Sequence, residues 1–434
     1  MGMNQTPASE RVHIGFFGRR NAGKSSIINA VTGQDLAIVS DVMGTTTDPV
    51  YKTMELLPLG PVMVIDTPGI DDEGELGALR VKKSYQVLNK TDIGVLVIDS
   101  TVGIGPQEEA LVRRFREKGI PFVVVYNKCD LLPGGQHSAA GNSPAGISEH
   151  PALSSTVISG GAALSPADSA EHSIYVSAAR NIHIQELKEL IATLKPEDSH
   201  RYPLIGDLMS PGDLIVLVVP IDKAAPKGRL ILPQQQTIRD ILDHGGLSLV
   251  VRDTELKDAL TNLRSGGITP RLVVTDSQVF ARVSQDTPTH IPLTSFSILF
   301  ARYKGDLGTA VQGAAALDQV QDGDKILIAE GCTHHRQCDD IGTHKIPGWI
   351  RQYTGKNPEF VFTSGTEFPD DVSGYRLVVH CGGCMLNERE MKYRTACCRD
   401  QGVPITNYGI LIAQVTGILR RSLEPFPDIL KQLS

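Results

Sequence analysis

Two groups of residues in this chain have types and spacing that suit chemistry, and the first is a phosphate-binding loop. Residues 18–25 read GRRNAGKS, the pattern of a glycine-rich loop that closes on a lysine and a hydroxyl residue. Gly18 and Gly23 allow backbone N–H groups to turn toward phosphate oxygens. Lys24 supplies positive charge to the β- and γ-phosphates, and Ser25 offers a hydroxyl to Mg²⁺. The loop therefore predicts binding of a nucleoside triphosphate.

Three further motifs follow in the order that a guanine-nucleotide site requires. DTPG begins at Asp66, whose carboxylate is expected to hold Mg²⁺ through water, and ends at Gly69, whose N–H is expected to contact the γ-phosphate. NKCD ends at Asp130, which can accept the two donors on the guanine edge, so GTP is favoured over ATP. SAA at 177–179 completes the base pocket. The residues expected to contact the nucleotide or its Mg²⁺ are Gly18, Asn21, Ala22, Gly23, Lys24, Ser25, Ser26, Thr45, Thr46, Asp66, Gly69, Asn127, Lys128, Asp130, Ser177 and Ala178.

A mobile switch is expected between the first two motifs, in the segment GTTTD at 44–48. A threonine of this segment would close over Mg²⁺, and Thr46 is favoured, with Thr45 as the second choice. The residue after DTPG is Ile70 rather than the glutamine that orients water in Ras-type enzymes. The acidic run at 71–73 either positions water or is a solvated surface. The residues predicted to act in hydrolysis are Lys24, Thr46, Asp66 and Gly69.

The second group consists of cysteines and histidines near the C-terminal end. Six of the seven cysteines lie in the last quarter of the chain, which indicates a local metal site rather than a disulfide framework. A C-x-H segment is followed at a distance by H-C-x-x-C, so three thiolates can converge on one point. This donor set suits an iron–sulfur cluster or zinc, and the spacing alone leaves both open. The predicted ligands are Cys332, Cys381 and Cys384, with His334 and His380 open between ligand and outer-shell donor.

The elements that must position these motifs alternate between short apolar strands and helices. A helical pattern at 106–118 lies between two of the strand-length runs. This alternation predicts a doubly wound α/β sheet in a first domain at 1–200. Residues 134–172 are rich in Gly, Ser, Ala and Pro and predict a flexible insertion in that domain. The strand-length runs lie at 12–17, 62–66, 93–98, 121–126 and 174–178.

Two smaller α/β domains are expected after residue 200. Strand and helix patterns at 205–290 predict a structural or dimerising module, because the segment holds no catalytic constellation. Residues 291–434 contain two apolar runs, 325–332 and 375–384, that each end in cysteine. Open α/β sheets usually build sites at the carboxyl ends of strands, so these runs would position the metal site. Cys397 and Cys398 lie in a helical pattern and are expected to be small buried hydrophobes.

Charge and hydropathy narrow the classes of partner. The formal net charge is −7, and no stripe of Lys and Arg resembles a surface for neutralising a phosphate backbone. Nucleic acid is therefore not an expected partner. The longest apolar runs are of strand length and the N-terminus has no apolar targeting core, so we expect no membrane association and a cytoplasmic location.

The motif order, with GTTTD at 44–48 and an apolar residue after DTPG, resembles the TrmE/Era/Der group of translation-factor-like GTPases. In the potassium-activated members of that group an asparagine stands where Asn21 stands here. The resemblance implies stimulation by K⁺ and slow intrinsic turnover. On the residues alone, an asparagine at this point is equally explained as a turn residue that tolerates unusual backbone angles.

The pattern C-x-H…H-C-x-x-C joined to a P-loop GTPase resembles the family of FeFe-hydrogenase maturation GTPases, HydF, over essentially the whole chain. The resemblance implies a GTPase domain, a dimerisation domain and a domain that carries a 4Fe-4S cluster on Cys332, Cys381 and Cys384. It also implies a scaffold that receives a diiron precursor from two radical-SAM maturases and passes it to the apo FeFe-hydrogenase. A homodimer is expected on the same ground.

Two other functions compete with this interpretation. One is a ribosome- or tRNA-linked GTPase whose C-terminal zinc module binds RNA, and the acidic net charge counts against it. The other is a metal-binding adaptor with a degenerate nucleotide site. It is weakened because Lys24, Ser25, Asp66 and Asp130 are all present.

Overall fold

The computed structural model describes most of the chain as two compact units, Arg11–Glu197 and Asp198–Ser434, the second with Met1–Glu10. Several predicted features lie outside the described residues, namely the segment at 44–48, the acidic run at 71–73, and the insertion at 134–172 apart from residue 172. The described residues are 8–33, 49–70, 81, 83–132, 172–195, 202–221, 230–331, 341–365 and 368–433.

The unit Arg11–Glu197 is built on a six-stranded sheet with the order β2-β3-β1-β4-β5-β6. All neighbouring strands are parallel except β2 and β3. The strands are β1 (Val12–Phe17), β2 (Val50–Leu56), β3 (Gly60–Asp66), β4 (Ile93–Asp99), β5 (Phe122–Asn127) and β6 (Ser173–Tyr175). The helices are α1 (Lys24–Thr32), α3 (Pro106–Glu117) and α4 (Ile184–Thr193).

This sheet is covered on both faces, which explains its nearly continuous apolar strands. Along β1, Ile14 and Phe16 point into one core with α1 and α4, whereas Phe17 points into a second core with α3. The strand β2 was not expected from the sequence. Most of its side chains are exposed, so it lacks the apolar run that identified the other strands.

The unit Asp198–Ser434 contains two four-stranded parallel sheets, ordered β10-β9-β7-β8 and β12-β11-β13-β14. The strands are β7 (Leu214–Val218), β8 (Leu247–Val251), β9 (Leu272–Thr275), β10 (Leu293–Ser295), β11 (Lys325–Ala329), β12 (Glu359–Thr363), β13 (Leu377–His380) and β14 (Ile405–Asn407). The helices are α5 (Leu232–Asp243), α6 (Leu256–Ser265), α7 (Phe280–Asp286), α8 (Phe296–Lys304), α9 (Leu307–Ala314), α10 (Ile346–Thr354), α11 (Glu388–Asp400), α12 (Tyr408–Val415), α13 (Leu419–Ser422) and α14 (Pro427–Leu430). The strand β10 follows residue 290, so the first of these sheets extends beyond the range 205–290.

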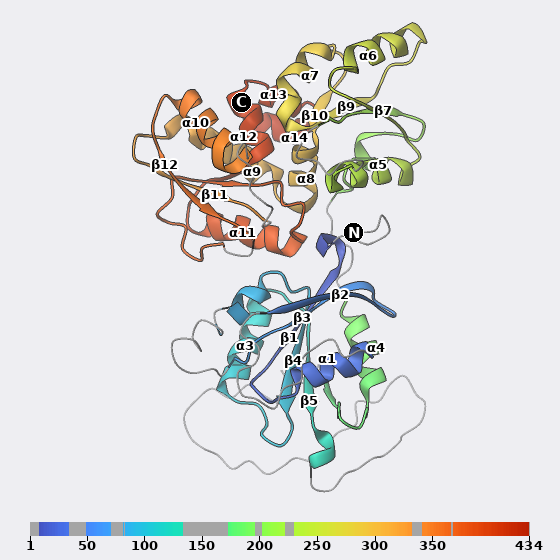
Figure 1. The fold of residues 1–434 in the computed structure, drawn as a ribbon, viewed down its shortest axis with the longest axis vertical. Coiled ribbons are helices and arrows are strands. Elements are labelled where there is room, and N and C mark those ends of the chain that lie inside the picture. Colours follow the sequence, from blue (N-terminus) through green and yellow to red (C-terminus); the bar gives the residue numbers. More distant parts are fainter. Residues whose placement is uncertain are drawn as a thin grey trace. The chain divides into compact units, whose positions relative to one another are not determined.

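One apolar core covers the sheet β10-β9-β7-β8 and reaches helices that follow this sheet in the chain. It joins Ile215 of β7 and Phe280 of α7 to Phe300 of α8 and Ile410 of α12. The sheet β12-β11-β13-β14 has its own cover, with α10 and α12 packed on one face and α11 on the other (Figure 1). The predicted α/β class is therefore confirmed. Among the described residues, none of the helices has both the length and the apolar character that a bilayer crossing needs.

Candidate functional site

The loop between β1 and α1 has the backbone that a phosphate cradle needs. Gly18, Asn21 and Gly23 have φ angles of 146°, 60° and 89°. A Cβ at Gly18 would lie 2.1 Å from the Val97 carbonyl oxygen, and one at Gly23 would lie 2.2 Å from Asn127 Nδ2. Both glycines are therefore required by close contacts as well as by backbone angle.

Lys24, the first residue of α1, is buried and folds back over this loop. Its Nζ donates to the carbonyl oxygens of Gly18 and Arg19 at 2.9 and 2.8 Å. These bonds hold the ammonium within the loop, where P-loops place the phosphates of a nucleotide.

Ser25 and Asp66 meet beside the loop and form a donor set for a hard cation. Ser25 Oγ donates to Asp66 Oδ2 at 2.8 Å. Burial raises the pKa of Asp66, opposed by the Ser25 hydrogen bond and the charge of Lys24. A buried carboxylate beside a hydroxyl fits Mg²⁺, which takes few protein oxygens and completes its shell with water and phosphate.

Asn127 connects three of the predicted motifs through hydrogen bonds of its side chain. Its Nδ2 donates to the Ala22 carbonyl oxygen at 3.0 Å, and its Oδ1 accepts from the Ala178 N–H at 3.2 Å. The first residue of NKCD thus joins the P-loop to the SAA segment. The sequence predicted it only as part of the base pocket.

The residues predicted to contact the base lie after β5 and after β6. Asp130 lies 3.5 Å from Arg180 Nε in an ion pair, and the side chain of Arg180 is 63% exposed. Ser177 Oγ accepts from the Arg180 N–H at 3.2 Å. Lys128 has φ 64° and its Nζ donates to Asp99 Oδ2 at 2.6 Å. Neither Arg180 nor Asp99 was predicted from the sequence as a site residue.

A further contact that the sequence analysis missed fixes the P-loop to the start of α3. Glu108 is buried, and its Oε2 accepts from Arg19 Nη2 at 2.7 Å and from the Gly105 N–H at 3.0 Å. A Cβ at position 105 would lie 1.7 Å from Arg19 Nη2, so the contact needs glycine there. The signal in the sequence is GPQE at 105–108, a helix start with proline in its first turn and an acidic residue that reaches back to the cap.

Four of the predicted site residues are not described by the structure. Thr45 and Thr46 of the switch, and Cys332 and His334 of the C-x-H segment, lie outside the described residues. Among the described residues, no three histidines, cysteines or carboxylates form a metal-binding group.

The other two predicted cysteine ligands lie in the loop after β13, at the carboxyl edge of its sheet. The strand β11, which leads toward position 332, is the parallel neighbour of β13. The Cys381 N–H donates to the Ala329 carbonyl oxygen at 2.9 Å. Cys381 Sγ accepts from the Gly331 N–H at 3.0 Å and from the Gly383 N–H at 3.4 Å. The sheet therefore brings the C-x-x-C loop beside the end of β11.

The chemistry of this loop fits a metal or cluster. Burial raises the pKa of Cys381, opposed by the backbone N–H groups of Gly331 and Gly383. Burial also raises the pKa of Cys384, opposed by the charge of Lys304. Backbone donors aimed at sulfur are typical of iron–sulfur sites, and a bound metal supplies the charge that deprotonates such thiols.

His380 has both ring nitrogens engaged. Nδ1 lies 2.7 Å from the Cys381 carbonyl oxygen, and Nε2 lies 2.9 Å from Arg394 Nη1. Arginine has only donors, so Nε2 is the acceptor and Nδ1 carries the proton. Burial, followed by the charge of Arg394, lowers the pKa of His380 to about 3, and the ring is neutral. In this arrangement both ring nitrogens of His380 are occupied by hydrogen bonds within the chain.

The cysteines of α11 are separate from this loop. Cys398 is fully buried, and burial raises its pKa to about 12, so it is a thiol packed in the core. Cys397 Sγ lies 3.6 Å from the Asp370 carbonyl oxygen. Neither contact involves the residues of the C-x-x-C loop.

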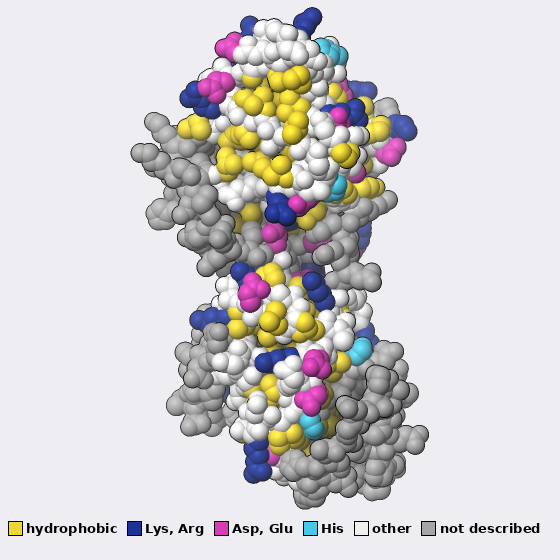
Figure 2. Space-filling model, turned by 90° about the vertical axis from the view of Figure 1, so that its right-hand side faces the viewer, with side chains coloured by type: hydrophobic (Ala, Val, Ile, Leu, Met, Phe, Trp, Pro, Cys, Tyr) yellow, Lys and Arg dark blue, Asp and Glu magenta, His cyan; other side chains and the backbone are white. Residues whose placement is uncertain are grey.

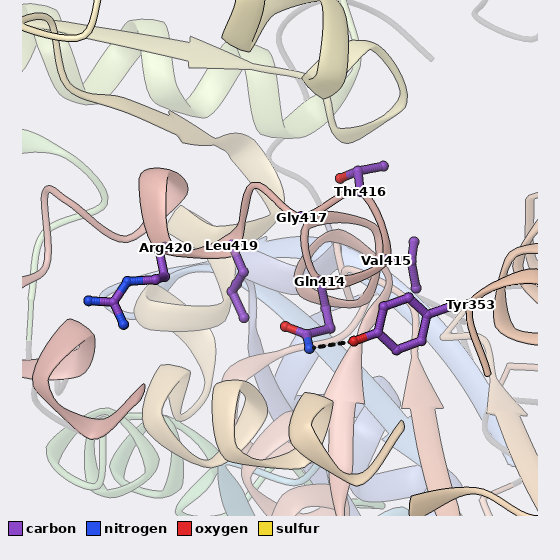
Figure 3. Close-up of a pocket in the computed structure, with 7 residues that line it drawn as sticks. All are labelled: Tyr353, Gln414, Val415, Thr416, Gly417, Leu419 and Arg420. Atoms are coloured by element: carbon purple, nitrogen blue, oxygen red, sulfur yellow. Dashed lines mark hydrogen bonds between the residues drawn. The ribbon is translucent and has the colours of Figure 1, made fainter. Parts of the chain in front are cut away.

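A cleft of about 450 Å³ lies at the end of α12 (Figure 3). The Tyr353 hydroxyl accepts from Gln414 Nε2 at 3.0 Å and donates to Asp318 Oδ1 at 2.8 Å. None of the lining residues is a cysteine, histidine or carboxylate, and none was predicted as a site residue. The lining residues are Tyr353, Gln414, Val415, Thr416, Gly417, Leu419 and Arg420.

The chain is similar to known proteins in all three of its parts. Residues 13–128 match the model described as 50S ribosome-binding GTPase. Residues 204–305 match the hydrogen maturase F dimerization domain, and residues 308–425 match the hydrogen maturase F tetramerization domain. The two hydrogen maturase F models together match about half of the chain.

Two curated GTPases each match about a quarter of the chain. GTPase Der of Kosmotoga olearia is 34% identical over 128 residues, which cover 28% of this chain and 29% of that protein. The tRNA modification GTPase MnmE of Burkholderia mallei is 36% identical over 123 residues, which cover 28% of this chain and 26% of that protein. The chain thus spans less than a third of either relative.

Among solved structures, Era of Aquifex aeolicus bound to GDP and AlF4⁻ is 18% identical, with a TM-score of 0.32. The superposition covers 55% of this chain and 92% of Era. The GTPase match, the dimerization module and the tetramerization module follow one another in one chain. This chain therefore belongs to the hydrogen maturase F family, with a GTPase domain at its N-terminal end.

Proposed function

We propose that this chain is a GTP-hydrolysing scaffold that binds a 4Fe-4S cluster, assembles the diiron precursor of the FeFe-hydrogenase active site and delivers it to the apo-hydrogenase. The observation that carries the proposal is a loop of two half-buried cysteines within a hydrogen maturase F module, in the same chain as an intact P-loop. Two radical-SAM maturases would supply the precursor.

At the nucleotide site, Lys24 would neutralise the β- and γ-phosphates of GTP, and Ser25 and Asp66 would hold Mg²⁺. The Gly69 N–H and Thr46 would contact the γ-phosphate and the metal. Asn21 is exposed at φ 60°, a conformation compatible with its proposed role beside K⁺.

At the cluster site, Cys332, Cys381 and Cys384 would bind three of the four irons. The cluster would supply an iron with an exchangeable position, which suits a carrier. The hydrogen bonds of His380 support His334, rather than His380, as the histidine able to occupy that position.

The family match supports self-association, and we assign the dimer surface to β8. This strand is the edge of its sheet, and Leu247 and Val250 expose apolar side chains on it, with Leu242 exposed at the end of α5. In the upper unit of Figure 2, hydrophobic side chains gather on the face that belongs to the α5, α6 and β7 side of Figure 1. An unpaired edge with exposed apolar residues favours pairing with a second copy.

The alternative function is a ribosome- or tRNA-linked GTPase with a C-terminal zinc module. The names of the relatives and of the GTPase model support it for residues 13–128. Residues 204–425 match maturase modules instead, and the net charge of −7 disfavours RNA.

The test is a transfer assay. The chain is purified anaerobically after coexpression with the two radical-SAM maturases and mixed with apo FeFe-hydrogenase, and hydrogen evolution is measured. We expect activation by the wild-type chain and none by Cys384→Ala. A colourless wild-type protein that contains zinc and activates nothing contradicts the proposal.

A further inference from the structure

Lys304, the last residue of α8, is a buried cation beside the cysteine loop. It is 4% exposed. Its Nζ donates to the carbonyl oxygens of Leu386 and Cys384 at 3.2 and 3.4 Å and lies 5.6 Å from the centre of the Phe300 ring. The loop that carries Cys384 is therefore held from α8, a helix of the preceding module.

Lys304 forms no ion pair within the described part of the chain. Burial lowers its pKa, and the charges that oppose this are Cys384 first, then Glu10 and Glu388. The two carbonyl oxygens accept from two of its three N–H donors but carry only partial charge. An ammonium removed from water without a full counter-charge is destabilising, so this position favours an anion next to it.

The second buried cation near the loop does not lack a counter-charge. Arg394 is fully buried, and its Nε donates to Glu390 Oε1 at 2.9 Å, so a buried carboxylate balances its charge. Lys304 is therefore the cation that can serve an anion bound by the cysteines. Three thiolates on a doubly positive cluster core leave a net negative charge, and one-electron reduction increases it.

We propose that Lys304 is a positioning residue and counter-ion for the cluster, which holds the Cys384 loop and makes the cluster easier to reduce. The inference rests on the proposed cluster function and deepens it. A nearby positive charge stabilises the more negative, reduced form, and so raises the reduction potential. The residue also joins two modules, because α8 lies in the module at 204–305 and Cys384 in that at 308–425.

The test compares the full-length wild-type chain with Lys304→Met, which keeps the length and removes the charge, and Lys304→Arg, which keeps the charge. Each protein is reconstituted with iron and sulfide, and the reduced cluster is followed by EPR during a redox titration. We expect a more negative midpoint in Lys304→Met and a midpoint near that of the wild type in Lys304→Arg.

The outcomes separate this inference from the proposed function. A wild-type chain without a cluster contradicts the proposed function, and this inference with it. A loaded wild type whose midpoint equals that of Lys304→Met contradicts the inference alone. Lys304→Met could fail to bind the cluster at all. In that case, recovery of cluster content in Lys304→Arg supports the counter-ion role of Lys304, whereas equal loss in both variants overturns that role.

Discussion

At the scale of single residues, the proposed contacts to phosphate and to the base lie on different side chains. Lys24 is held inside the P-loop by two carbonyl oxygens, whereas Asp130 lies beyond β5 and contacts Arg180. A substitution of Lys24 should therefore lower the affinity for any nucleotide. A substitution of Asp130 should instead change which base is preferred.

Lys24→Ala should weaken GTP binding on the order of 10²-fold, because hydrogen bonds to a charged group contribute roughly 1.5–3 kcal/mol each. The measurement is calorimetry with a non-hydrolysable GTP analogue. Lys52→Ala, an exposed lysine of β2, is the matched control. Equal affinities in the two variants would contradict the phosphate role of Lys24.

Asp130→Asn should exchange GTP for xanthosine triphosphate as the preferred nucleotide. Xanthine presents an acceptor where guanine presents a donor, and an amide can donate to it. The loss for GTP should be on the order of 10²-fold, and competition between the two nucleotides measures it. Arg180→Ala should change GTP affinity by less than about fivefold, since exposed ion pairs contribute roughly 0–1 kcal/mol. An unchanged preference in Asp130→Asn would remove the base-pocket assignment.

At the scale of elements, α11 supports the cysteine loop through a buried polar network. Arg394 Nη1 donates to His380 Nε2 on β13, and its Nη2 donates to the Gly365 carbonyl oxygen at 2.7 Å. Glu390, one turn earlier on the helix, completes the network. This network orients the histidine that precedes Cys381.

Arg394→Met should lower the free energy of unfolding of its unit by about 3–5 kcal/mol, because Glu390 is left as an unpaired buried charge. Chemical denaturation of the full chain measures it. Arg399→Met, on the same helix at a side chain that is 65% exposed, should cost less than about 1 kcal/mol. If both variants lowered the free energy of unfolding by a similar amount, the network would not be what stabilises this unit.

The second prediction at the scale of elements concerns the edge strand β8. Leu247→Glu combined with Val250→Glu should disrupt the proposed dimer, since burial of each apolar side chain is worth about 1.5–3 kcal/mol and a buried carboxylate costs more. Light scattering after gel filtration reports the mass. Val102→Glu, an exposed apolar position of the other unit, should leave the oligomer unchanged. A dimer that persists in the double variant would exclude β8 as the interface.

At the scale of the whole molecule, sequence reasoning succeeded where one short segment carries the signal. Strands such as β1 and β5 are buried on both faces and appear as apolar runs, and the P-loop and C-x-x-C motifs are contiguous. The α/β class and the family predicted from these segments are confirmed. The cluster ligands and the base-contacting residues stay predictions.

The contacts that were missed are those made in three dimensions. Lys304 and the Cys384 carbonyl are 80 residues apart, and Arg19 and Glu108 are 89 apart, so no local pattern joins them. The strand β2 was missed for a different reason, because an exposed edge strand needs no apolar run. Residues of this kind can be identified only from the folded structure, where their burial and their partners are known.

The central claim is that one chain combines an independent GTPase site with a cysteine-bound cluster. Its most direct test measures iron, sulfide and GTP turnover in the anaerobically reconstituted wild type and in Cys384→Ala. We predict about four irons per chain and an EPR signal on reduction in the wild type, both lost in the variant, with GTP turnover unchanged. A variant that keeps its iron and its signal, or loses turnover and cluster together, would contradict the claim.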